Sequence, residues 1–144
     1  MFEDHPEFHR SLYGEHFISA SSLHGQMAWR KAHLDADEAQ RERQAALFEA
    51  HLDALCVGEE RALTVASDSV DPRRRGDVYV LVALLCRRGL WDELPLFAAK
   101  VDSTRPAMIE AIVDALRRDP EQRPRVLEVA SVSLREEVES KLDS

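Results

Sequence analysis

Histidine, aspartate, glutamate and cysteine lie within a few residues of one another in the stretch EAHLDALCVGEERAL, which runs from Glu49 to Leu63. These residue types bind metal ions and act as acids, bases or nucleophiles. The stretch also has the spacing of an amphipathic helix that ends at Gly58. Three interpretations are therefore open: a chemical site, a core helix or a surface that binds a partner.

The evidence for catalysis is weak. His51 and Asp53 could suggest part of a catalytic triad, but a spacing of two residues places them on different sides of a helix. The chain has five glycines, no phosphate-binding loop and no serine in a nucleophile elbow. We therefore predict no catalytic residues and a protein that is not an enzyme.

The histidines gather near the start of the chain, where five of the six lie within the first 33 residues. His5 and His9 are four residues apart, and such a pair on a helix can bind zinc. However, Pro6 follows His5, and the chain contains neither an H-E-x-x-H nor a C-x-x-C motif. We predict no metal and no other cofactor, and expect these histidines to be exposed or half-buried helix residues.

The composition is that of one ordinary globular domain of 144 residues, with 44% hydrophobic and 32% charged residues. Alanine, leucine, arginine and glutamate dominate, and all are good helix formers. The start of the chain has no apolar signal-peptide core, and no apolar run approaches the roughly 20 residues that span a bilayer. Two cysteines do not make a disulfide framework. These features predict a cytoplasmic protein without a membrane partner.

The net charge of −8 is unevenly distributed. Residues 1–72 contain 14 acidic and 6 basic side chains, whereas residues 73–144 contain 13 of each. Nucleic acids bind basic surfaces, so an acidic chain argues against nucleic acid as the partner. The acidic half is compatible with a basic protein partner.

Helical periodicity predicts three helices in the acidic half. The first covers about Leu12–Leu34, the second about Asp37–Val57, and a shorter third about Glu59–Ala66. Asp37 is a candidate N-cap, and Gly58 is a candidate for the position after a helix C-terminus. The polar stretch SDSVDPRRRGD then breaks the pattern with a proline and a glycine. On the first helix, one side is expected to carry Phe17, Leu23, Met27 and Leu34.

The second half contains an apparent repeat of 30 residues. The segments VYVLVALLCRRG (78–89) and MIEAIVDALRRD (108–119) align at their apolar positions and at their Arg-Arg pairs. LPLF (94–97) and PRVL (124–127) follow at the same offset. Two helix pairs in tandem predict a short α-solenoid of the HEAT-like type. A final segment, SLREEVESKLDS, starts with the capping-box pattern of Ser133 and Glu136 and would cap the stack.

The same register extends back to the second helix. Phe48, Leu52, Leu55 and Cys56 then match Val78, Val82, Leu85 and Cys86. Because Cys56, Cys86 and Leu116 occupy one position of the repeat, both thiols are expected to be buried hydrophobic side chains.

The most informative feature lies on the second helix. Its acidic residues are separated by 4, 7 and 4 positions, and at about 100° per residue they share one narrow face. They are Glu38, Glu42, Glu49 and Asp53, which together we call the acidic surface. Phe48, Leu52 and Leu55 lie beside them, so the helix is expected to present an acidic edge along an apolar seam. A solvated edge beside the core stripe is the simpler and more common interpretation of this pattern; the charge asymmetry strengthens the other interpretation, docking of a basic partner.

Arginines form three clusters. Arg87-Arg88 and Arg117-Arg118 are expected at helix C-termini, where cations complement the helix dipole. Arg73–Arg75 is expected in a loop, either solvated or contacting an acidic group of a partner.

Two quoted stretches resemble a known family. LFEAHLDALCVGEERAL and the later DPRRRGDVYVLVALLCRRGLWDELPLF resemble the N-terminal part of an uncharacterised HEAT-like bacterial family associated with type VI secretion gene clusters. The matching segments are Glu49–Leu55, Asp71-Pro72 and Gly76–Tyr79, and the resemblance covers about residues 15 to 100. Ala54 stands where the family has glycine, and the arginines of Arg73–Arg75 expand the loop. The resemblance implies a role in competition between bacteria and supplies no catalytic residues.

We therefore expect a single all-α domain over residues 1–144, a HEAT-like stack of seven or eight helices. Residues 1–72 would form acidic helices, and residues 73–144 two helix pairs and a cap. The expected function is protein binding, foremost an immunity protein that neutralises a type VI secretion effector toxin through its basic toxin domain. An effector adaptor, chaperone or scaffold of the secretion system is the alternative, and a small enzyme ranks last.

Overall fold

The computed structural model describes residues 6–32, 38–90, 92–98, 100–101 and 105–118. These residues contain six helices and no strands, so the all-α prediction is confirmed for them. Six is fewer than the seven or eight helices expected. The segments expected to supply the additional helices, 124–127 and the cap from Ser133, lie outside the described residues. No helix in the described segments has the length and apolarity to cross a membrane.

The helices follow one another along the chain and fall into two compact units, Met1–Val70 and Asp71–Ser144. The single-domain organisation stays a prediction. Unit 1 contains α1 (Pro6–Ala32), α2 (Glu38–Val57) and α3 (Glu59–Ser69), and unit 2 contains α4 (Arg75–Arg87), α5 (Glu93–Ala98) and α6 (Pro106–Arg118).

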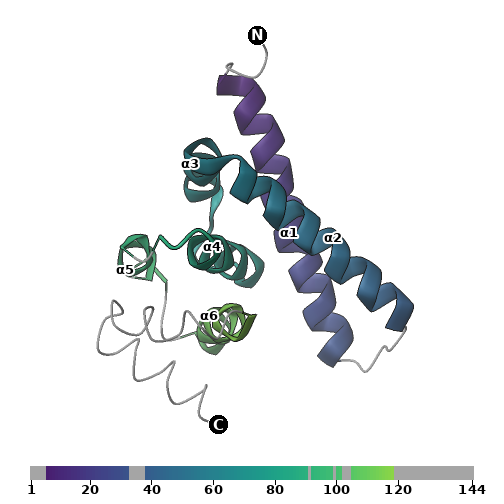
Figure 1. Cartoon of the computed structure of the whole chain (residues 1–144). Helices are drawn as coiled ribbons and strands as arrows, with labels where there is room; N and C mark the ends of the chain where they lie inside the picture. Colours follow the sequence, from purple (N-terminus) through teal and green to yellow (C-terminus); the bar gives the residue numbers. More distant parts are fainter. Residues whose placement is uncertain (1–5, 33–37, 91, 99, 102–104, 119–144) are drawn as a thin grey trace. The chain divides into compact units, whose positions relative to one another are not determined.

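Unit 1 is built on the packing of α1 against α2, with α3 contacting both (Figure 1). The two long helices run antiparallel, because a residue late in α1, Gln26, contacts Gln44 early in α2. Apolar side chains repeat at helical spacing on the packed faces, as an amphipathic helix requires. The buried residues are Phe17, Ala20, Phe48, Leu52, Leu55, Ala62 and Ala66.

The helix boundaries are close to those expected in this unit. α1 begins six residues earlier than predicted, at Pro6, where a proline in the first turn costs no hydrogen bond. Along α1, Phe17 is buried as expected, and Leu23 and Met27 are half-buried. The expected N-cap Asp37 and the apolar Leu34 lie outside the described residues.

Gly58 follows α2 directly but has a different role from the one expected. A glycine after a helix commonly takes a left-handed conformation, whereas Gly58 has φ −69° and ψ −12°. The positive φ, 53°, lies one residue later at Glu59. Gly58 is instead a point of close approach: a Cβ there would lie 2.6 Å from both the Ala62 Cβ and the Tyr13 ring. The absence of a side chain lets α1 reach the α2–α3 junction.

Unit 2 is built on α4 and α6, which pack along each other, and the short α5 contacts α4. All ten residues from Asp77 to Cys86 are buried, so α4 is enclosed on every side. α6 is amphipathic and exposes Glu110. The repeat predicts matching burial at six positions, and both members of each pair are buried: Val78 and Met108, Tyr79 and Ile109, Val82 and Ile112, Ala83 and Val113, Leu85 and Ala115, Cys86 and Leu116. The helical repeat itself stays a prediction.

The two cysteines differ. Cys86 is buried as expected, but Cys56 is half-buried, so the prediction for Cys56 is wrong in degree. Cys56 follows Glu49 by seven residues, which is close to two helical turns. It therefore points toward the acidic edge of α2 and away from the centre of the buried stripe.

A tight turn precedes α4. The Arg74 N–H donates to the Asp71 carbonyl at 2.9 Å, which closes a turn that has Pro72 at its second position. The Asp71 carboxylate accepts the Arg73 N–H at 2.9 Å, and buried Asp77 accepts the Asp71 N–H at 2.9 Å. The pKa of Asp71 is lowered, mainly by the hydrogen bond from the Arg73 backbone. The Asp-Pro motif thus has a structural role as the N-terminal boundary of α4.

The close approach at Gly58 predicts that Gly58→Ala destabilises the protein. The added methyl group would clash with Tyr13 and with Ala62, whose Cβ cannot move without its backbone. Overpacking of this kind costs about 1–3 kcal/mol, which outweighs the stabilisation that alanine normally brings to a helix. Urea unfolding followed by circular dichroism measures the change.

Gly25→Ala is the matched control, because nothing lies within 4 Å of a Cβ at Gly25 within α1. There the substitution should raise the free energy of unfolding by up to about 1 kcal/mol, since alanine is the better helix former. Equal effects of the two substitutions would show that the contact with Tyr13 does not constrain position 58.

Candidate functional site

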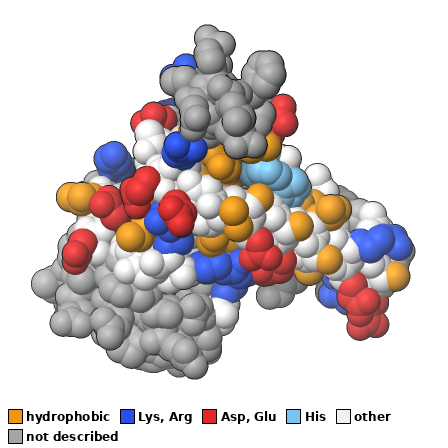
Figure 2. Space-filling model, turned by 45° about the horizontal axis from the view of Figure 1, so that its top comes forward, with side chains coloured by type: hydrophobic (Ala, Val, Ile, Leu, Met, Phe, Trp, Pro, Cys, Tyr) orange, Lys and Arg blue, Asp and Glu red, His pale blue; other side chains and the backbone are white. Residues whose placement is uncertain are grey.

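The acidic surface lies entirely on α2. Its four members are all the acidic residues of that helix. Glu38, Glu42 and Asp53 are exposed, and Glu49 is half-buried. Glu38 and Asp53 are fifteen residues apart, which corresponds to about 22 Å along the helix axis, so the surface is long and narrow. Acidic groups reach the molecular surface in Figure 2.

The acidic surface is exposed because of the orientation of α2 about its own axis. The adjoining face of the helix is buried in unit 1 through Phe48, Leu52 and Leu55, whose exposed fractions are 0–1%. These three residues form the buried stripe beside the acidic edge, where α1 and α3 cover α2. The large apolar side chains that α2 does expose are Leu47 and Val57, at 52% and 81%.

The structure brings His51 to a partner that the sequence did not suggest. Its Nδ1 atom lies 2.9 Å from the Nδ1 atom of His16 on α1, 35 residues earlier. The ring centroids are 5.1 Å apart and the planes are inclined by 53°. The pKa of His51 is lowered by burial and, to a lesser extent, by His16. Asp53 is exposed, and the partner that the structure gives His51 is His16 of α1.

A second polar contact joins the same helices. The Gln44 side-chain amide donates to the Gln26 carbonyl oxygen at 2.9 Å, and Gln44 is 7% exposed. A buried amide costs free energy unless it is hydrogen-bonded, so this contact favours one register of α1 against α2. Together, the glutamine and histidine contacts fix α2 at two points along its length.

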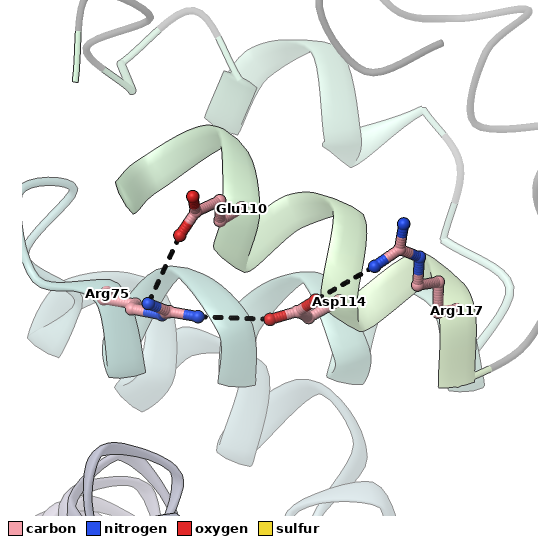
Figure 3. A network of polar contacts seen from close by, with 4 residues as sticks. All are labelled: Arg75, Glu110, Asp114 and Arg117. Carbon is pink, nitrogen blue, oxygen red and sulfur yellow. Dashed lines mark hydrogen bonds and ion pairs between the residues drawn. The ribbon is translucent and has the colours of Figure 1, made fainter. Parts of the chain in front are cut away.

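The arginines of unit 2 contact groups within the chain. Arg75, expected in the loop, is instead the first residue of α4. Its guanidinium lies 3.4 Å from Glu110 and 3.2 Å from Asp114, one turn apart on α6 (Figure 3). Arg117 approaches Asp114 from the other side at 3.8 Å. This network ties the start of α4 to the middle of α6, which is a structural role.

The expected helix C-terminal arginines lie where predicted. α4 ends at Arg87 with Arg88 as its C-cap residue, and α6 ends at Arg118. Arg118 also donates to the Tyr79 hydroxyl at 3.4 Å, with its guanidinium carbon 5.9 Å from the ring centroid. This cation–π geometry adds a second α6–α4 contact.

Metal binding has little support in the part of the chain that the structure describes. No group of three or more histidine, cysteine, aspartate or glutamate side chains there could hold a metal ion. His5 lies outside the described residues, so the structure does not test the His5–His9 pair, and the absence of a metal stays a prediction. What unit 1 offers is an exposed row of carboxylates on a helix fixed from behind.

No known family, curated protein or solved structure matches this chain. The resemblance to the HEAT-like family associated with type VI secretion therefore stays a prediction that rests on the short segments quoted above.

The network of Figure 3 predicts that Arg75→Met lowers the free energy of unfolding by about 0.5–1 kcal/mol. The effect is modest because Arg75, Glu110 and Asp114 are 35–47% exposed and water screens their charges. Denaturant unfolding in low salt measures the loss, which should shrink in 1 M NaCl.

Arg73→Met is the control, since Arg73 is 71% exposed and contacts only a neighbouring side chain, Asp71, in the described part of the chain. Its effect should stay within about 0.5 kcal/mol. If Arg73→Met cost as much as Arg75→Met, the link between α4 and α6 would not be the source of the stability.

Proposed function

We propose that the chain is a protein-binding module, and specifically a cytoplasmic immunity protein that neutralises a type VI secretion effector toxin. The observation that carries the proposal is the row of carboxylates on α2, exposed on a helix whose other side is buried. The charge asymmetry of the chain and the family resemblance support the same conclusion. The acidic surface would bind the basic toxin domain.

The spacing of the carboxylates suits long-range attraction. Successive members of the surface are separated by about 6 to 11 Å along the axis, which is comparable with the Debye length of about 8 Å at physiological salt. Their potentials therefore add for a partner that approaches the helix. Complementary charge raises the association rate and excludes partners of the wrong sign, so nucleic acid would be repelled and a basic protein attracted.

The mechanism of neutralisation would be competition. A toxin that acts on nucleic acids or nucleotides needs a basic cleft, because its substrate carries phosphates. A rigid helix with a row of carboxylates can occupy such a cleft and exclude the substrate. Exposed Val57 follows Asp53 by four residues and so lies near the same face of α2, where its apolar area can add affinity to this electrostatic contact.

We predict that the Glu38→Lys/Glu42→Lys double variant associates at least about tenfold more slowly with the toxin domain encoded beside this chain. Two reversals remove attraction and add repulsion at the N-terminal end of the acidic surface. Stopped-flow or surface plasmon resonance at low and high salt measures the association rate. The salt dependence should become weaker than that of the original protein, because fewer favourable charges are left to screen.

The control is Glu15→Lys/Asp68→Lys, which changes the net charge equally but uses exposed residues of α1 and α3. Its association rate should fall far less. Equal losses in both variants would show that only total charge matters, and no loss in either would mean that α2 is not the docking surface.

Co-expression with the toxin domain distinguishes an immunity protein from an adaptor, chaperone or scaffold. An immunity protein rescues growth of cells that express the toxin domain, and the Glu38→Lys/Glu42→Lys variant should rescue less well. An adaptor, chaperone or scaffold would bind the effector outside its toxin domain and give no rescue.

A further inference from the structure

His16 on α1 and His51 on α2 contact each other and so join the two long helices of unit 1. A single hydrogen between the two facing ring nitrogen atoms makes this contact. The two Nδ1 atoms are 2.9 Å apart, which is hydrogen-bond distance for nitrogen atoms. Both side chains are half-buried. In Figure 2, histidine side chains of unit 1 are visible among hydrophobic ones, so protons from solvent can reach this part of the surface.

Three protonation states of the pair have different consequences. When both rings are neutral, one Nδ1–H donates to the lone pair of the other. When one ring is protonated, the imidazolium still donates to the neutral ring, and a charge-assisted hydrogen bond is the stronger kind. When both rings are protonated, each Nδ1 carries a hydrogen and neither can accept. The second proton therefore replaces a hydrogen bond with the repulsion of two cations.

The surroundings offer little compensation for a second positive charge. One turn away on α2, the neighbours of His51 are Leu47, Phe48, Ala54 and Leu55, none of which carries a charge. On α1, the corresponding neighbours of His16 are Leu12, Tyr13, Ser19 and Ala20, of which only Tyr13 can titrate, and its ring lies at Gly58.

The third helix of the unit also lacks a compensating buried charge. α3 packs against both α1 and α2, and all its charged side chains are exposed: Glu59, Glu60, Arg61 and Asp68. Buried His24 is a further histidine on α1. No carboxylate is among the groups that shift the pKa of His51.

We propose that His16 and His51 form a proton-sensitive clasp between α1 and α2, which holds while the pair carries at most one proton and opens when it takes a second. Opening would be local, because the Gln26–Gln44 contact farther along the helices cannot titrate. The part of α2 around His51, which carries Glu49 and Asp53, would loosen first.

The direction of the pH effect follows from linkage. The pKa of His51 in the folded protein lies below its ordinary value of 6.5 because burial and His16 disfavour its charged form. The unfolded chain therefore binds more protons than the folded chain between the two values. Stability is full above pH 6.5 and is lost as the pH falls through the lowered pKa of His51.

A double-mutant cycle isolates the clasp from every other titrating group. The proteins are the original chain, His16→Phe, His51→Phe and the double variant, each unfolded by urea at pH 8 and pH 5. At pH 8 the coupling between positions 16 and 51 should change the unfolding equilibrium constant about fivefold in favour of the folded state. At pH 5 the coupling should vanish or reverse. An equal, favourable coupling at both pH values would overturn the proposal.

His16→Gln should preserve stability at low pH, which a merely structural contact between the two rings would not predict. Its amide oxygen can accept from His51 in either protonation state, so this variant should lose less stability between pH 7 and pH 5 than the original protein. Histidine NMR titration adds a second measure: the midpoint of His51 should rise toward 6.5 in both position-16 variants, because the charge of His16 is gone. A His51 midpoint unaffected by either substitution would show that the two rings do not share a proton.

Hydrogen exchange tests where the clasp opens. Acidification from pH 7 to pH 5 should reduce protection, after correction for the intrinsic rate, more in residues 48–57 than in residues 40–46. Uniform loss along α2 would contradict a local opening. All these measurements need only the purified chain, so they stand or fall separately from the proposed binding of a toxin.

Discussion

The rotation of α2 about its own axis is the constraint on which unit 1 depends, and burial of Phe48, Leu52 and Leu55 determines it. These side chains are separated by four and three residues, so they form one stripe that can be removed from water only in one orientation. Each contributes about 1.5–3 kcal/mol when fully buried. Once the stripe faces the core, the carboxylates of α2 must face solvent and His51 must lie at the edge of the α1–α2 contact.

The helices of unit 2 are buried and held in register differently from those of unit 1. α4 is buried on every side from Asp77 to Cys86, while α6 exposes polar side chains to solvent. The register between them is set by apolar packing along their length and by Arg75, which spans two carboxylates one turn apart on α6. A cation that satisfies two anions on a neighbouring helix fixes both the rotation and the offset of that helix.

Much of the secondary structure could be predicted because it depends on local pattern. The 3.6-residue periodicity and the Pro-Gly break after Ser69 located the helices to within a few residues, and the spacing of Glu38 to Asp53 identified their common face. Periodicity shows which residues share a face, but it does not show which helices of the chain cover that face, as they cover Leu52.

The histidine and glutamine contacts needed information that no single helix contains. His16 and His51 meet because α1 and α2 are antiparallel and because both residues lie at similar distances from the connection between the helices. Gln26 and Gln44 also lie at similar distances from the connection between the helices. An antiparallel pairing of the two periodic patterns would have placed these residues near one another, although not at 2.9 Å. The distance depends on how the helices cross, which packing decides.

The distribution of charge on α2 is itself unfavourable for stability. Glu38 with Glu42, and Glu49 with Asp53, are like charges four residues apart, and each such pair costs a helix about 0.2–0.5 kcal/mol. α2 also has no basic residue in its last turn, where a cation would complement the helix dipole. In unit 2, the like-charged Glu110 and Asp114, also four residues apart, are both contacted by Arg75 of the neighbouring helix. The four carboxylates share one edge of α2, a helix that also carries exposed Arg41 and Arg43, and this grouping of like charges is consistent with the proposed role in recognition.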